Sequence, residues 1–339
     1  MTKHSTPPEL YLPIDTARWL PGVCSENTPY LEIWPMSFYD EILLRNPDGL
    51  MNGKSIETVI KNCVPAIKNP GLIPESDYRY IFTAITLATN GEKATFNSAC
   101  SKCKEFNQYE LDIQQMLIEY QTAPIPEEFR IDDLIFSVKE IFYQDLVEYR
   151  SNSYGLSKSI SNLQKRPEQS FDVAKLQKEI NHYRTNELLL KTKKINSISS
   201  ENFGSVTDSG YILQFLKTAD KQIMQQVNAH LDQKQRSNRK EIVCSDCNHK
   251  NKVQVEIDPA DQFFSKLVNT NDEEIEDLFK GIDKEIDKLH KEIANLVWYM
   301  RGSVSYQECM HMSPREIRSL QEQIKENLEN SKKIGVPLI

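Results

Sequence analysis

Two short cysteine motifs, far apart in the sequence, constrain the fold of this chain more than any other feature. The first reads CSKCKEFNQYELDI and contains Cys100 and Cys103; the second reads CSDCNHKNKVQVEID and contains Cys244 and Cys247. Each is expected to form a strand, a Cys-x-x-Cys turn and another strand, which is half of a zinc ribbon. The repeat predicts that the two segments pack together, although residues 104–243 separate them.

Four thiolates from two such turns complete a tetrahedral site, so we expect Cys100, Cys103, Cys244 and Cys247 to bind one Zn²⁺. A site of this kind has no open position, and its zinc is structural rather than catalytic. The wide separation departs from compact zinc spacings, and a long insertion explains it because loop-closure entropy grows only logarithmically with length. Two alternatives stay open: two unrelated reduced thiol pairs, or a redox-active Cys-x-x-Cys.

Other potential metal ligands are interpreted as ordinary side chains. His249 lies just past the second turn and is expected to be solvated. Nothing near Cys309 and His311 in the sequence completes a second site. Cys63 lies on an apolar helix face and is expected to be a core thiol.

Composition and motif content argue against several functional classes. The chain of 339 residues carries a net charge of −8, which opposes nucleic-acid binding because phosphate contacts need a basic surface. It has only 11 glycines and no phosphate-binding glycine motif, zinc-protease motif or serine-hydrolase motif. No enzymatic activity, catalytic residue or cofactor-binding residue is therefore expected apart from the metal-binding cysteines. No signal pattern or apolar stretch long enough to span a membrane is found, so we expect no membrane partner.

The fold class expected is mainly α with a small β zinc-ribbon module, split in sequence by a long helical insertion. The interpretation divides the chain as follows: an extended N-terminal arm at 1–33 with short strands at 10–12 and 30–34, a helical domain at 34–90, zinc-ribbon halves at 91–113 and 241–258, the insertion at 114–240, and a C-terminal helical region at 259–339. Within the insertion, helices are expected at 114–121, 142–163, 171–195 and 207–234, and the Ser/Asn-rich stretch 196–205 is interpreted as a linker.

A seam of apolar residues marks the longest C-terminal helix. Its members are spaced 4, 3, 4, 3, 4, 3 and 4 residues apart: Ile275, Phe279, Ile282, Ile286, Leu289, Ile293, Leu296 and Met300. This pattern fits a helix packed on its own domain, and it also fits a coiled coil that lets the chain associate with itself through residues 275–300. Charge is uneven nearby: residues 272–292 carry four Lys against nine Asp/Glu, whereas residues 158–195 carry nine Lys/Arg against four Asp/Glu.

Several blocks of the sequence resemble the T-even-type bacteriophage baseplate hub protein family of contractile tails. They are LYLPIDTARWLPGVCSENTPYLEIWPMSFYDEILLRNPDGLMNGKSIETVIKNCV, PESDYRYIFTAITLATNGEKATFNSACSKC, DLIFSVKEIFYQDL and WYMRGSVSYQECMHMSPREIRSLQEQI. The resemblance implies a structural subunit of the tail baseplate, at or near the central hub, made in the host bacterial cytoplasm and located in the virion. Its partners would be other baseplate, hub and tail proteins.

Two other functions remain as alternatives. One is a tail-assembly chaperone that is absent from the mature virion. The other, from a different class, is a zinc-ribbon nucleic-acid-binding module that would use a basic segment containing Lys165, Arg166, Lys191, Lys193 and Lys194. Net charge argues against the second.

Overall fold

The computed structural model describes residues 7–26, 28–122, 127–164, 172–202, 204–231, 239–254, 257–269 and 272–334. The helices are α1 Phe38–Leu43, α2 Pro47–Met51, α3 Lys54–Cys63, α4 Glu75–Asn90, α5 Ile113–Thr122, α6 Tyr143–Gln164, α7 Val173–Lys194, α8 Ser209–Thr218, α9 Lys221–Leu231, α10 Pro259–Asn269, α11 Asp272–Tyr299, α12 Tyr306–His311 and α13 Pro314–Ile334. The strands are β1 Leu10–Pro13, β2 Tyr30–Ile33, β3 Lys93–Ala99, β4 Phe106–Asp112, β5 Glu128–Ile131, β6 Leu134–Val138, β7 Ile195–Ser200, β8 Gly204–Val206, β9 Arg239–Val243 and β10 Lys250–Gln254.

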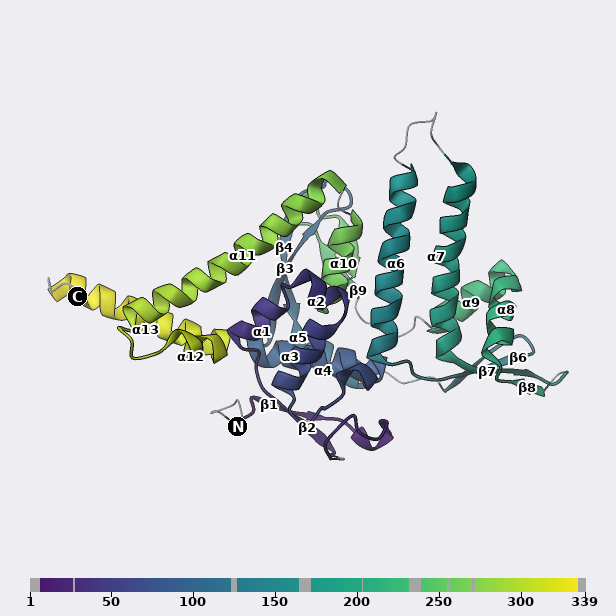
Figure 1. Ribbon diagram of the computed structural model, residues 1–339, viewed down its shortest axis with the longest axis horizontal. Helices are drawn as coiled ribbons and strands as arrows, with labels where there is room; N and C mark the ends of the chain where they lie inside the picture. The colour runs from purple at the N-terminus through teal and green to yellow at the C-terminus, as the bar shows by residue number, and fades with distance from the viewer. Residues whose placement is uncertain are drawn as a thin grey trace.

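The main hydrophobic core lies around α3 and α4, in the middle of the molecule (Figure 1). On α3 the apolar residues recur at helical spacing and are fully buried: Ile56, Val59, Ile60 and Cys63. The core thiol expected at Cys63 is thus confirmed. Burying each such aliphatic side chain stabilises the fold by about 1.5–3 kcal/mol relative to leaving it exposed.

The N-terminal strands expected at 10–12 and 30–34 are present as β1 and β2, which pair antiparallel. Their inward residues Leu12, Leu31 and Ile33 belong to the main core, so the described part of this segment packs on its own chain. The indole of Trp19 also donates a hydrogen bond to the Asp77 carboxylate on α4, at 2.6 Å.

A buried ionic cluster joins three segments that are distant in sequence. Arg150 on α6 contacts the carboxylates of Asp258 and Asp261, each at 2.6 Å, and the hydroxyl of Tyr78 on α4 donates to Asp258 at 2.8 Å. Burial disfavours charge on Asp258, but the guanidinium of Arg150 and the Tyr78 hydroxyl lower the pKa of this carboxyl overall. The cluster therefore fixes α6, a helix of the insertion, against α4 and the segment that enters α10.

The described part of the insertion is mainly helical and also contains a four-stranded sheet. Helices α6 and α7 stand side by side, and beyond them lies an antiparallel sheet in the order β5-β6-β7-β8 with α8 and α9 (Figure 1). The expected linker at 196–205 is wrong, because residues 195–200 form β7 between β6 and β8. Ile195 and Ile198 pack into a second core there, and Ser197 and Ser200 of the same strand are also buried.

The single helix expected at 207–234 is also wrong. The described residues form two helices, α8 and α9, with a break at Ala219 and Asp220. The Asp220 carboxylate accepts a hydrogen bond from the backbone N–H of Ile223, so it caps the start of α9.

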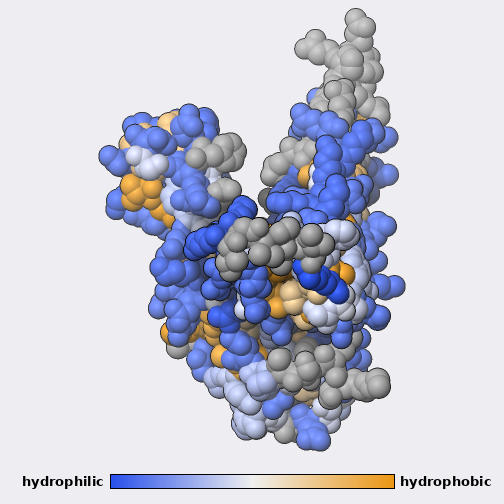
Figure 2. All heavy atoms as spheres, turned by 90° about the vertical axis from the view of Figure 1, so that its left-hand side faces the viewer, coloured by the Kyte–Doolittle hydropathy of each residue, from blue (hydrophilic) through white to orange (hydrophobic). Residues whose placement is uncertain are grey.

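The apolar seam of α11 packs within the chain. Phe279 and Ile282 contact the main core, whereas Ile293 and Leu296 form a smaller core with Phe38 of α1 and with residues of α12 and α13. This favours the interpretation of a helix packed on its own domain. On the face seen in Figure 2 the surface is mostly hydrophilic, and hydrophobic residues emerge in separate small patches. None of the helices described here combines the length and the apolar character needed to cross a membrane.

Candidate metal centre

The two cysteine motifs form two β-hairpins with the same local geometry. β3 pairs with β4 so that Ala99 faces Phe106, and β9 pairs with β10 so that Val243 faces Lys250. Each Cys-x-x-Cys begins directly after the first strand of its hairpin. The register thus places the first cysteine of each pair at the same point of its turn.

The backbone of the two turns is also equivalent. The residue after each second cysteine has a positive φ, 67° at Lys104 and 54° at Asn248. Its backbone N–H donates to the carbonyl of the first cysteine, Cys100 or Cys244, at 3.0 Å in both hairpins. This tight turn directs both sulfurs of a pair to one side.

The four sulfurs meet in one cluster. The Sγ atoms of Cys100 and Cys247 are 3.6 Å apart, and so are those of Cys103 and Cys244; all four lie within 4.8 Å of one another. Sulfurs bound at about 2.3 Å to one tetrahedral zinc would be roughly 3.8 Å apart. The cysteines that the sequence separates by 140 residues, positions 104–243, are therefore brought together in a geometry that could hold a metal ion.

A reciprocal pair of asparagines holds the two hairpins together. Asn107, on the first hairpin, donates to Cys244 Sγ at 3.4 Å and accepts from the backbone N–H of Ser245 at 3.0 Å. Asn251, on the second hairpin, donates to Cys100 Sγ at 3.5 Å and accepts from the backbone N–H of Ser101 at 2.9 Å. Each asparagine is buried, and each serves the turn of the other hairpin.

These polar partners were missed in the sequence interpretation, although the repeat contains them. Both copies read Cys-Ser-x-Cys-x-x-x-Asn, so the serine and the asparagine recur at the same distances from the first cysteine. Alignment of the two copies beyond their cysteines would have identified Ser101, Ser245, Asn107 and Asn251. Such groups around a metal site orient its ligands and tune its affinity.

The thiols differ in their tendency to ionise. The backbone N–H of Cys103, and then that of Lys102, lowers the pKa of Cys100 to about 6. The backbone N–H of Glu105 favours the Cys103 thiolate, but burial and the neighbouring thiols raise its pKa to about 12. By the same causes the pKa of Cys244 is lowered and that of Cys247 is raised. Four neighbouring thiolates repel one another, and a divalent cation relieves that repulsion.

Other potential ligands lie elsewhere. His249 is half-buried and uses its carbonyl to accept from the backbone N–H of Cys244, while Cys309 is buried in the small C-terminal core. Within the described ranges, the four cysteines form the group of His, Cys, Asp and Glu side chains close enough to share a metal ion.

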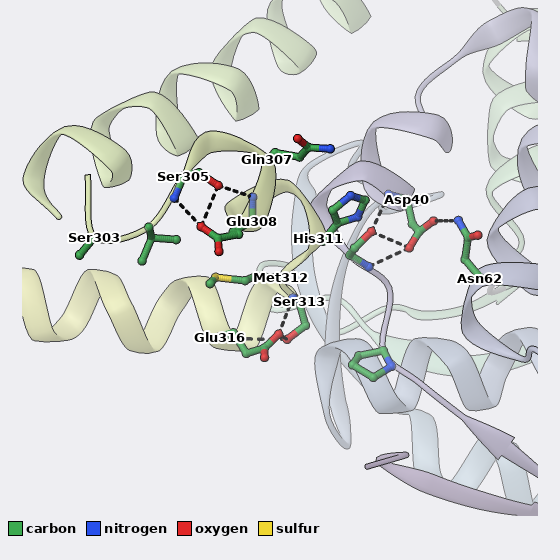
Figure 3. Close-up of a pocket in the computed structure, with 13 residues that line it drawn as sticks. Asp40, Asn62, Ser303, Ser305, Gln307, Glu308, His311, Met312, Ser313 and Glu316 are labelled. Atoms are coloured by element: carbon green, nitrogen blue, oxygen red, sulfur yellow. Dashed lines mark hydrogen bonds between the residues drawn. The ribbon is translucent and has the colours of Figure 1, made fainter. Parts of the chain in front are cut away.

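A separate cavity of about 610 Å³ lies between α1, α12 and α13 (Figure 3). Its carboxylates belong to helix-capping boxes. Asp40 accepts from Ser37, Glu308 from Ser305 and Glu316 from Ser313, each through the serine backbone N–H and hydroxyl. The last of these lies at the start of α13. These carboxylates thus have a structural role at helix starts.

The comparison with known families confirms the baseplate part of the resemblance seen in the sequence. The model of the T4 bacteriophage base plate protein family matches residues 39–265, about two thirds of the chain. The chain belongs to this family. The matched segment runs from α1 into α10 and contains both cysteine hairpins and the insertion between them. No curated protein and no solved structure matches the chain.

The reciprocal asparagines are expected to strengthen zinc binding by the four cysteines. Replacing Asn107 or Asn251 with Ala (N107A, N251A) leaves four cysteines but removes the acceptor of a serine N–H, and we expect each variant to bind zinc about 10–100-fold more weakly. Competition with a chromophoric chelator measures this affinity. Gln108→Ala is the matched control, since Gln108 is the exposed neighbour of Asn107 on β4. If N107A and N251A bound zinc as tightly as the control Gln108→Ala, the asparagines would not position the cysteines.

Proposed function

We propose that this baseplate family member is a structural subunit of the contractile tail baseplate, at or near the central hub, that acts through contacts with other tail proteins. The family match over residues 39–265 is the observation that carries the proposal. Its site of synthesis would be the host cytoplasm, and its final location the virion tail.

In this proposal the cysteine cluster holds one structural Zn²⁺. Cys100, Cys103, Cys244 and Cys247 would supply four thiolates and fill a tetrahedral coordination shell. The distances between the sulfurs support zinc. So do the hydrogen bonds that the side-chain amides of Asn251 and Asn107 donate to the sulfurs of Cys100 and Cys244. The zinc would tie together the two ends of the insertion, so that the insertion is presented at a fixed orientation.

The proposal assigns no enzymatic activity. A tetrahedral four-thiolate site leaves no position for substrate or water. The carboxylates around the cavity of Figure 3 hold helix starts together, and this supports an architectural role for that region.

Charge pairing around the basic segment supports protein partners over nucleic acid. Lys191 pairs with Glu187 at 2.5 Å, Lys194 with Glu75 at 2.8 Å, and Lys193 with both Asp145 and Glu148 at 2.8 and 2.7 Å. Lys165 and Arg166 lie outside the described residues. These paired lysines offer little free charge to phosphate.

A phage with an early stop codon in this gene tests the proposed role. We expect infected cells to contain heads but no complete baseplates on electron microscopy, and a loss of infectious particles that expression of the intact chain in trans restores. In complemented particles, a tagged chain should label the tail end near its axis. Normal tails and a normal titre without the chain would contradict the proposal, and an axial structure that forms without label would contradict the hub position.

A further inference from the structure

The sulfurs of the metal centre also lie in pairs that run between the two hairpins. Cys100 Sγ is 3.6 Å from Cys247 Sγ, and Cys103 Sγ is 3.6 Å from Cys244 Sγ. In each pair one cysteine belongs to the turn after β3 and the other to the turn after β9. Because a disulfide holds its sulfurs about 2 Å apart, a small movement of two side chains brings either pair to bonding distance.

Each pair combines a cysteine that solvent reaches with one that it does not. Cys103 and Cys247 are half-buried, whereas Cys100 and Cys244 are buried. A small oxidant therefore meets Cys103 or Cys247 first. Its product there, a sulfenic acid, condenses with a neighbouring thiol to form a disulfide. The buried cysteine of the opposite hairpin supplies that thiol at 3.6 Å.

Contacts that involve no metal ligand hold the hairpins against each other. The Asn107 side chain accepts a hydrogen bond from the backbone N–H of Ser245 at 3.0 Å, and the Asn251 side chain accepts one from the backbone N–H of Ser101 at 2.9 Å. Both asparagines are buried. Because none of these atoms binds the metal, the two bonds keep the turns facing each other while the sulfurs react.

The proposed function takes the chain through two redox environments. The host cytoplasm keeps thiols reduced, and there four cysteines favour metal binding. The surroundings of a released virion are oxidising, and disulfides form and persist in them. The link between the two ends of the insertion therefore has to withstand oxidation of its cysteines.

We infer that a peroxide converts the cysteine cluster into two disulfides, Cys100–Cys247 and Cys103–Cys244, which replace the metal ion as the link between the hairpins. In each pair the first thiol takes one oxygen from the peroxide and releases one water. The partner thiol then attacks that sulfur, forms the S–S bond and releases a second water, so that two electrons pass from the pair to one peroxide. When Zn²⁺ is bound, it leaves the thiolates, and two solvent protons per pair complete the waters. The inference rests on the proposed function for the change of environment, and it adds the pairing of the cysteines and the class of oxidant.

Counting the thiols of the purified full chain is the first test. The chain, either loaded with zinc or treated with a chelator, is exposed to hydrogen peroxide, and its remaining thiols are alkylated after denaturation. We expect alkylation to fall from seven thiols to three. The three that remain are those outside the cluster: Cys24, Cys63 and Cys309.

Proteolysis then resolves which cysteines are joined. Cleavage after Lys102 and before Asp246 separates the two cysteines of each motif. Mass spectrometry of the fragments should find the two pairs named above. Links within a motif, any other pairing, or seven thiols that stay reduced would overturn the inference.

Two double variants compare a pair between hairpins with a pair within one motif. Cys103→Ser with Cys244→Ser retains Cys100 and Cys247, whereas Cys100→Ser with Cys103→Ser retains Cys244 and Cys247. With the same oxidant and no metal, we expect the first variant to form its disulfide faster. Equal rates, or a faster second variant, would contradict the pairing.

Thermal unfolding shows whether the disulfides replace the metal. A bond between the hairpins closes a loop through residues 101–246, and cross-links over long loops restrict the unfolded chain most. The oxidised, metal-free chain should therefore melt at a higher temperature than the reduced, metal-free chain, and an equal or lower melting temperature would overturn the inference. If the chain binds no zinc, the proposed structural metal fails, and the disulfide map of the chelator-treated chain decides the inference separately.

Discussion

Replacing Cys244 with Ser is expected to abolish stoichiometric zinc binding and to unfold the two-hairpin module. The binding free energy of a structural zinc, roughly 10–16 kcal/mol in isolated zinc modules, contributes directly to folding. Loss of one of four thiolates should therefore cost several kcal/mol locally and lower the melting temperature. Elemental analysis of the purified chain, which should show one zinc per wild-type molecule, measures the binding.

Cys24→Ser provides the control for this experiment. Cys24 is a half-buried cysteine that forms an isolated β-bridge with Ile67, away from the cluster, so its substitution should leave the zinc content unchanged. Cys100→Ser, Cys103→Ser and Cys247→Ser should behave like Cys244→Ser. An unchanged metal content and melting temperature in these four variants would eliminate the zinc site.

Removing the cation of the buried ionic cluster is expected to destabilise the fold strongly. Arg150→Met removes the cation between Asp258 and Asp261, and we expect it to lower the free energy of unfolding by about 3–5 kcal/mol, because the buried carboxylate of Asp258 loses its cation. Because the folded-state pKa of Asp258 is lowered, its contribution to stability exists above the ordinary carboxyl pKa and is lost as the pH falls through the folded-state value. Denaturant unfolding at neutral and acidic pH measures both effects.

A surface ion pair serves as the comparison for Arg150. Lys193→Met removes contacts with Asp145 and Glu148, where the Lys193 side chain is 43% exposed, and should cost about 1 kcal/mol or less. If Arg150→Met destabilised the chain no more than Lys193→Met, the cluster would not be what holds α6 against α10.

The sequence interpretation identified the cysteine cluster because the evidence for it is local and repeated. A Cys-x-x-Cys turn needs only a few residues, and two copies in one chain indicate a shared site. The helix starts at Ser37 and Ser313 were predictable for the same reason, since a capping box is complete within four residues.

Features that depend on tertiary contacts were not predictable in this way. The serines of β7 suggested a linker, yet hydrogen bonding to β6 and β8 makes this segment a central strand. Arg150 and Asp258 lie 108 residues apart, and neither residue differs in the sequence from an ordinary surface charge. The reciprocal asparagines, Asn107 and Asn251, recur at the same position of the repeat, but their role depends on each one reaching the opposite hairpin.

Quantitative mass spectrometry of mature tails from the phage that encodes this chain tests the central claim most directly. The chain should be present at a fixed number of copies relative to the sheath subunit, as a built-in part of the baseplate. Presence in tail intermediates with none in mature tails would indicate an assembly chaperone and contradict the proposed virion role. Absence from both would contradict the structural role altogether.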